Sequence, residues 1–256
     1  MKYGVEENTE IAPGVFIERR SFLKGSTLAT LALLTNCPKH LFARRYERCI
    51  EKLNEPVGSG ELTWEEFIIQ TVPLAQAALK ESNDVDYYLY RVASMAARLQ
   101  AVPETKLFPL VKDSTAITLG PNYKGPPFAV IQWRMDPGAV FPPHNHPNYS
   151  VCTLGLEGNA RIRNYEVVGA PPEFTSKKTF QIRQTHDEVL SAGRINTLSP
   201  HRDNIHRFEA GKDGARGIDI TTLHGSDVGF SFIHLEDRAV DPERRIFEAT
   251  WKGSEI

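Results

Sequence analysis

Short apolar and β-branched runs, separated by turn residues, dominate the chain from about residue 116 onward. The clearest run is 128–135, which ends at Pro137 and Gly138. The other runs that predict strands are 149–155, 159–167, 178–184, 194–199, 205–210, 215–222 and 228–235. About eight short strands with frequent Gly, Pro, Asp or Asn turns are typical of a β-sandwich or a closed jelly roll. We therefore expect a mainly β fold.

A helical pattern precedes these strands. Thr63 and Glu66 form the sequence signature of a capping box, in which each side chain accepts a hydrogen bond from a free backbone N–H. Pro73 is expected to kink or split the helix that follows. Asp84 can cap a second helix, whose apolar face has residues three and four apart: Val85, Leu89, Val92, Ala96 and Leu99. We expect this pair of helices to pack outside the β unit.

The first forty-odd residues have the layout of an export signal. Arg19 and Arg20 precede a short, weakly apolar run at 25–34, which is too short to span a membrane. The segment resembles a twin-arginine signal, whose cargo crosses the membrane already folded. An ordinary buried or amphipathic helix is the alternative, and the acidic residues before the arginines are untypical of a leader. We expect a periplasmic or otherwise exported protein, with the twin-arginine export machinery as partner and no membrane in the mature form.

Composition and charge narrow the function classes. The 256 residues are 41% hydrophobic and 24% charged, with a formal net charge of −2, so no concentrated basic surface indicates a nucleic-acid partner. The three cysteines form no spaced framework, and Cys152 lies in a predicted strand, where we expect a buried, inert thiol. We divide the chain into a signal peptide (1–43), a linker and helical segment (44–115), and a barrel (116–256).

Two histidines carry the clearest chemistry. His144 and His146 are two residues apart, so on a strand both imidazoles point to the same face, into a barrel. Inward imidazoles are costly to bury unless their lone pairs are used, and a metal ion uses them. A third ligand must come from a neighbouring strand. We expect His206 to supply it, and His201 is the alternative if the register shifts.

These residues resemble the two cupin motifs, through Gly138, His144, His146 and Gly158, and later through Gly193, Pro200 and His206. The chain is more closely similar to thiol dioxygenases of the cysteamine dioxygenase and plant cysteine oxidase type. The register of their first motif holds from Pro137 to Glu166, and their second motif resembles Asp203 to Phe208. Their aspartate on the following strand is matched by Asp219. The resemblance covers roughly residues 116–236.

The resemblance implies a cupin barrel that binds Fe(II) and oxidises a small thiol or an N-terminal cysteine with O2 to a sulfinate. The usual fourth cupin ligand, a glutamate, is replaced by Val151. Three neutral imidazoles leave the ion doubly positive, with open positions for a thiolate and dioxygen. Zn, Mn or Ni remain possible occupants. A zinc-dependent hydrolase or lyase, and a non-catalytic metal or ligand binder, are the competing functions.

Two further residues are candidate catalytic groups. Asp219 is expected to orient the substrate or a ligand imidazole, and a simple turn-end hydrogen bond is the alternative. His224 is expected to line the pocket, and a surface or satisfied histidine is its alternative. The chain departs from the plant-type enzymes at 224–226, where it has His-Gly-Ser and they carry a tyrosine. The chain also differs from the cysteine dioxygenases proper, which hold the substrate carboxylate with an arginine just before the strand that corresponds to 128–135. This chain has no arginine there, and Lys124 is the nearest cation.

Overall fold

The computed structural model describes residues 62–80, 85–111, 114–125, 127–174, 176–224 and 230–253. The predicted signal peptide at 1–43 and the predicted cap Asp84 lie outside these ranges, as do two of the three cysteines. Within them, no helix is both long and apolar enough to cross a bilayer.

Two helices, α3 (Trp64–Lys80) and α4 (Val85–Ala96), form the helical part of the described chain. The predicted capping box at the start of α3 is confirmed. The Thr63 N–H donates to Glu66 Oε2 at 2.9 Å, and the Glu66 N–H donates to Thr63 Oγ1 at 3.2 Å. The bond from the Thr63 N–H, and then a bond from the Thr63 hydroxyl to the same carboxylate oxygen at 3.0 Å, hold the pKa of the Glu66 carboxyl below its usual value.

The helix α3 continues through Pro73 as one element, so Pro73 does not split it, and the alternative of a kink stays a prediction. Proline removes one backbone hydrogen bond from a helix, which is the one to the carbonyl four residues earlier, at Ile69. Ile69 is 70% exposed, so solvent can reach this part of the helix surface, whereas Phe67 and Ala75 are fully buried. Phe67 and Ala75, on either side of Pro73, thus place both halves of the helix in the core that it shares with α4 and the sheet.

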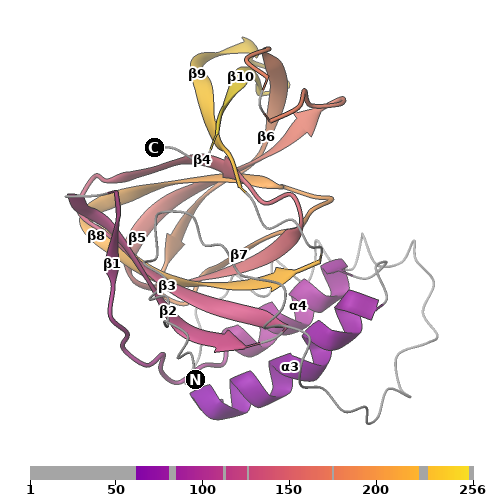
Figure 1. The fold of residues 1–256 in the computed structure, drawn as a ribbon. Coiled ribbons are helices and arrows are strands. Elements are labelled where there is room, and N and C mark those ends of the chain that lie inside the picture. Colours follow the sequence, from indigo (N-terminus) through magenta and orange to yellow (C-terminus); the bar gives the residue numbers. More distant parts are fainter. Residues whose placement is uncertain are drawn as a thin grey trace, which may run out of the picture.

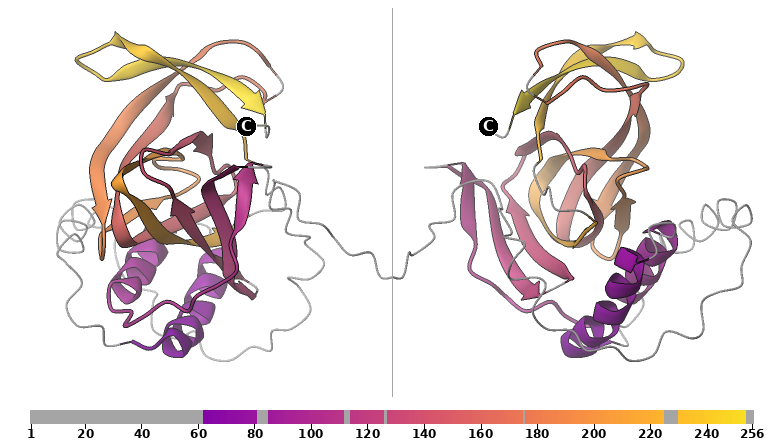
Figure 2. Two further views of the ribbon diagram at one scale, coloured as in Figure 1. Left: turned by 90° about the vertical axis from the view of Figure 1, so that its left-hand side faces the viewer. Right: turned by 45° about the vertical axis from the view of Figure 1, so that its right-hand side comes forward.

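The two helices pack together on one outer side of the sheet (Figures 1 and 2). All five residues of the predicted apolar face of α4, including Leu99, are buried. They form one core with sheet residues that point outward: Phe128, Val130, Cys152, Leu154, Ile195, Ile218 and Ile220. Cys152 is a free, fully buried thiol whose pKa is raised by burial, as expected of an inert cysteine. The predicted placement of the helical pair outside the β unit is confirmed.

Ten strands follow. Their bounds are β1 Phe108–Val111, β2 Ser114–Gly125, β3 Phe128–Met135, β4 Val140–Asn145, β5 Tyr149–Val168, β6 Phe180–Ser191, β7 Ile195–Leu198, β8 Ile205–Leu223, β9 Phe232–Asp241 and β10 Ile246–Gly253. The sheet therefore begins at residue 108, upstream of the position 116 at which the strand pattern becomes clear. The strands β1, β2 and β10 were not among the predicted runs, and Pro109 and Pro121 interrupt the apolar pattern of the first two strands.

Two pairs of predicted strands merge into single long strands. The runs 149–155 and 159–167 form β5, and 205–210 and 215–222 form β8. Gly158, whose φ is 61°, lies at the first junction, where the register of β5 against β8 shifts. A bulge of this kind bends a strand without ending it. In the sequence, a glycine at a bulge cannot be told apart from a glycine at a turn.

The strands close into a barrel. Consecutive hydrogen-bonded neighbours run β8–β4–β9–β10–β6–β5, and β5 pairs with β8 to complete the ring. Strands β3, β2 and β1 extend the sheet beyond β8, and β7 extends it beyond β5. The register joining β4 to β9 is the pair His144 and Phe232. The predicted mainly β, jelly-roll barrel is confirmed.

Strand alternation decides which residues face the inside of the barrel. On β8, Ile218 and Ile220 point outward to the helices, so Asp219 points inward. On β5, Cys152 and Leu154 point outward, so Tyr149, Val151 and Thr153 line the inner face. The inner surface also carries the apolar cluster that includes Trp133, Met135, Ile162 and Phe208.

Candidate metal centre

Three histidines from β4 and β8 meet inside the barrel. His144 ends β4 with Asn145, His146 follows directly, and His206 lies opposite His144 in the antiparallel β4–β8 pair. The Nε2 atom of His206 is 3.0 Å from Nε2 of His144 and 3.0 Å from Nε2 of His146. Their ligand atoms all lie within 4.8 Å of one another, and all three side chains are buried.

The protonation of these imidazoles favours a bound cation. His144 Nδ1 lies 2.9 Å from the Pro142 carbonyl and can donate to it, which leaves the lone pair on Nε2. Burial lowers the pKa of His144 to about 4 and holds the pKa of His146 and His206 well below the usual value, so all three are neutral at pH 7. His206 Nε2 lies close to Nε2 of both His144 and His146, and it can carry only one proton. It can therefore donate a hydrogen bond to only one of these two nitrogen atoms. A divalent metal ion accepts all three lone pairs at once.

Two asparagines hold the histidine segment in place. Asn204 Nδ2 donates to the His146 carbonyl at 2.6 Å, and the His146 N–H is shared between the Asn204 carbonyl and Oδ1. Asn145 Oδ1 accepts the Ser231 N–H at 2.7 Å. The residues flanking the ligands are thereby fixed to β8 and to the start of β9. Sequence reasoning missed both asparagines, because their partners are far away along the chain.

Aromatic rings surround the imidazoles. Phe141 stacks on His144 with ring centroids 4.5 Å apart, and Phe208 contacts His206 edge-on at 4.6 Å. Phe230 and Phe232 lie about 6 Å from His144, at 6.0 and 5.9 Å. These rings exclude water from the imidazoles, which is the physical cause of their lowered pKa values. Only their apolar character was visible in the sequence.

Tyr149 is a further residue of the site that the sequence did not single out. It follows His146 after the turn at Pro147 and Asn148, and its ring meets the His146 imidazole edge-on, at 4.6 Å and 89°. Burial, followed by the charge of Asp219, raises the pKa of its phenol, which is therefore a hydrogen-bond donor at neutral pH.

Asp219 lies on the inner face of β8, opposite Thr153 of β5. The Thr153 hydroxyl donates to Asp219 Oδ1 at 2.7 Å. Burial raises the pKa of this carboxyl to about 6. Asp219 is separate from the group of three histidines that converge, and it faces the same interior from the β5–β8 wall.

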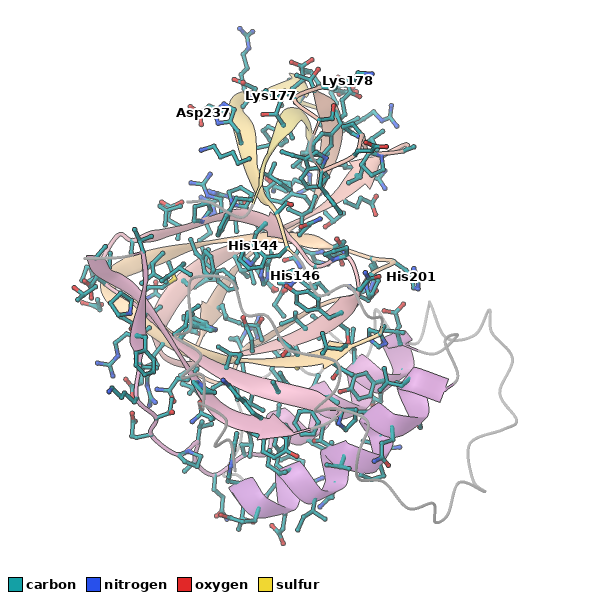
Figure 3. All side chains as sticks on the ribbon, in the orientation of Figure 1. His144, His146, Lys177, Lys178, His201 and Asp237 are labelled. Atoms are coloured by element: carbon teal, nitrogen blue, oxygen red, sulfur yellow. The ribbon has the colours of Figure 1, made fainter. Side chains whose placement is uncertain are left out.

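His201 and His224 are not brought to this cluster. His206, and not His201, completes the group, since His201 is exposed (Figure 3). Figure 3 also shows His144 and His146 side by side beneath the β9–β10 arm, with His201 apart from them. His224 Nε2 lies 2.9 Å from Ser150 Oγ, and burial lowers the pKa of His224 to about 4. A role for His224 in catalysis stays a prediction.

Comparisons with solved structures find matches of low similarity. KdgF from Halomonas sp. is 16% identical with a TM-score of 0.34, over 48% of this chain and 92% of that chain. An oxalate oxidase in complex with glycolate has the same identity and TM-score, and the match covers 47% of this chain and 57% of that chain. The Schizosaccharomyces pombe Cnp3 cupin domain is 14% identical with a TM-score of 0.33, over 48% and 72%. No curated protein matches the chain.

The match to a protein family is more extensive. The family model described as PCO_ADO matches residues 83–222, which is more than half of the chain. The matched region includes the three converging histidines, Tyr149 and Asp219. The chain therefore belongs to the PCO_ADO family, a family of cupin-fold thiol dioxygenases.

Proposed function

We propose that this protein is a non-haem Fe(II) thiol dioxygenase that oxidises a small thiol or an N-terminal cysteine to a sulfinate. The observation that carries the proposal is the converging group of three neutral histidines, in a chain that belongs to a thiol dioxygenase family. The group contains no carboxylate and no thiolate. The full charge of a divalent ion would therefore be available to attract an anionic thiolate.

The reaction balances without an external reductant. The thiol sulfur loses four electrons, O2 gains four, and both oxygen atoms enter the sulfinate, so RSH and O2 give RSO2H. A bound Fe(II) would supply the redox chemistry that joins oxygen to sulfur. His144, His146 and His206 would hold the ion, and Phe141 and Phe208 support two of these imidazoles by direct ring contact.

Asp219 favours a substrate that carries an amine. It is a charged residue on the inner face of the β5–β8 wall, whereas Lys124, the nearest cation before β3, is exposed. A carboxylate inside the barrel can pair with an ammonium group, and it repels a substrate carboxylate. We therefore expect a Cys-initiated peptide or cysteamine to be oxidised in preference to 3-mercaptopropionate.

Oxygen uptake tests this function. Protein loaded with iron under anaerobic conditions is mixed with cysteine, cysteamine, 3-mercaptopropionate or a Cys-initiated peptide, and products are analysed for sulfinate by mass spectrometry. A Ser-initiated peptide of the same sequence and zinc-loaded protein are the matched controls. Uptake equal to sulfinate formed, from at least one thiol, is the expected result. Full iron occupancy with no thiol-dependent uptake would contradict it, and zinc in protein from its native source would favour hydrolase or lyase chemistry.

The same proposal includes the predicted export. Residues 1–43 would act as a twin-arginine signal, and the protein would be folded, with its metal selected, before it reaches the periplasm or the exterior. This order would suit an Fe(II) protein, because copper and zinc bind imidazole sites more tightly than iron does.

A further inference from the structure

We propose that Tyr149 is a substrate-binding residue, whose hydroxyl donates a hydrogen bond to a carbonyl oxygen of the thiol bound at the three-histidine site. The inference deepens the proposed function, on which it rests, because it concerns which thiols the same site selects. Three observations support it: the place of Tyr149 on the barrel wall, the contact that fixes its ring, and the lack of a partner for its hydroxyl among the described residues.

The place of Tyr149 follows from strand register. Tyr149, Val151 and Thr153 share the inner face of β5, and their partners in β8 are Leu223, Thr221 and Asp219. Tyr149 contacts His146 and so lies at the histidine end of this wall. Asp219 is paired with Thr153, four residues after Tyr149 along β5, so it lies beyond Val151 on the same wall. The wall therefore offers a ligand two polar groups, a phenol beside the histidines and a carboxylate deeper in the barrel.

The ring of Tyr149 is held by its neighbours. The imidazole of His146 lies against it at 4.6 Å with an angle of 89° between the planes. The backbone carbonyl of the turn residue Asn148, just before it, accepts a hydrogen bond from the backbone N–H of His224 at 2.7 Å. A ring fixed in this way presents its hydroxyl in one direction, which lowers the entropy cost of binding a ligand.

The hydroxyl itself is available. Among the residues that the structure describes, it makes no hydrogen bond. It is also not one of the fully buried polar atoms that lack a partner, so it is not sealed inside the protein. By contrast, Asp219 Oδ1 is already engaged by the Thr153 hydroxyl. A fixed donor with no internal partner, beside a metal-ligand histidine, is suited to a substrate oxygen.

The chemistry of the substrate identifies that oxygen. In a Cys-initiated peptide the sulfur, the amine and the carbonyl oxygen lie within a few bonds of one another. If Asp219 pairs with the amine, the carbonyl oxygen needs a donor, and a phenol is one. Cysteamine has the same sulfur and amine but no carbonyl group. Tyr149 should therefore increase affinity for the peptide and leave affinity for cysteamine unchanged.

The test measures thiol binding separately from turnover. Cobalt-substituted protein is titrated anaerobically with a Cys-initiated peptide and with cysteamine, and the thiolate-to-cobalt absorption band gives each Kd. We expect Tyr149→Phe to raise the Kd for the peptide about three- to tenfold, as loss of one hydrogen bond does, and to leave the Kd for cysteamine unchanged. The control Tyr123→Phe removes a hydroxyl from a ring that packs on Phe128, on the helix side of the sheet, and should change neither value.

Other outcomes would overturn the inference. If Tyr149→Phe changed neither Kd, the hydroxyl would not contact the substrate. If it weakened both thiols equally or lowered cobalt content, Tyr149 would act on the metal site and not on the carbonyl. Failure of the proposed function looks different: wild-type protein would bind thiols with the expected preference, but its iron form would consume no oxygen. Absence of thiol binding by the wild type would overturn both.

Discussion

His206 lies directly opposite His144 in the antiparallel β4–β8 pair, and their Nε2 atoms are 3.0 Å apart. The two residues are 62 positions apart in the chain, and the register of this strand pair alone brings them together. Because both imidazoles are neutral and buried, their close approach is favourable when a cation lies between their lone pairs.

Replacing His206 tests the metal centre. We expect His206→Ala to reduce bound metal to about a tenth of the wild-type content or less, since one of three ligands is lost. The barrel should remain folded, as judged by far-UV circular dichroism. His201→Ala, five residues away and exposed, is the matched control and should keep its metal. Normal metal content in His206→Ala would contradict the assignment.

Replacing Asp219 tests the cost of its burial. Because burial raises its folded pKa to about 6, above its usual value of 3.8, the folded protein binds the proton more tightly than the unfolded chain does. The free energy of unfolding therefore decreases as pH rises from about 4 to 6. In metal-free protein at pH 7, we expect Asp219→Asn to be more stable than the wild type by about 1–3 kcal/mol.

Urea unfolding at several pH values measures this difference. It should shrink as the pH is lowered from 7 towards 4, because the wild-type carboxyl becomes protonated in both states. Asp237→Asn, at an exposed position on β9, is the control and should show little change at any pH. A stability difference that does not depend on pH would show that the charge of Asp219 is not its cause.

Asn204 should matter for the position of His146. In Asn204→Ala the carbonyls of His146 and Ser199 lose their side-chain donor, and we expect a loss of about 2–3 kcal/mol in the free energy of unfolding. Asn204→Asp keeps an acceptor for the His146 N–H but sets a carboxylate oxygen against the two carbonyl oxygens, so its loss of stability should be at least as large. Metal affinity should fall about tenfold in the alanine variant, measured by competition with a chelator. Unchanged affinity would mean that the backbone bonds suffice.

Val151 tests why the site has no carboxylate ligand. The residue is 1% exposed, on the inner face of β5, two residues from Tyr149. We expect Val151→Glu to retain metal but to lower thiol turnover about tenfold or more, because a carboxylate ligand reduces the charge of the ion and occupies a position on it. Val151→Gln has a similar size without the charge and should lose less activity. Equal activity in the two variants would exclude the charge as the cause.

The export signal can be tested in cells. Replacing Arg19 and Arg20 together by lysine keeps both charges but removes the guanidinium pair, and we expect the precursor to accumulate in the cytoplasm. Cell fractionation with an antibody to the protein measures this. Lys24→Arg, which changes a nearby cation without touching the pair, is the control and should be exported. Normal export of the double variant would reject the twin-arginine prediction.

Local periodicity was sufficient for much of the fold and failed where contacts are long-range. The limits of β3, the capping box at Thr63 and the apolar face of α4 follow from spacing over a few residues, and the structure confirms them. The continuity of β5 and β8 was missed, because a bulge glycine and a turn glycine look alike in a sequence. Pro73 was expected to kink or split a helix that continues through it as one element.

The sequence by itself determined that His144 and His146 face one way, since residues two apart share a side of an extended strand. His224 comes five residues after Asp219. Since an odd spacing puts two residues on opposite faces of a strand, the same alternation would have placed His224 on the face opposite to Asp219. Only the tertiary structure decided that His206 and not His201 is the third histidine, and that Asn145, Asn204, Tyr149 and the phenylalanines complete the site. These choices depend on the register between strands far apart in the chain, and that register is set by how the whole barrel closes.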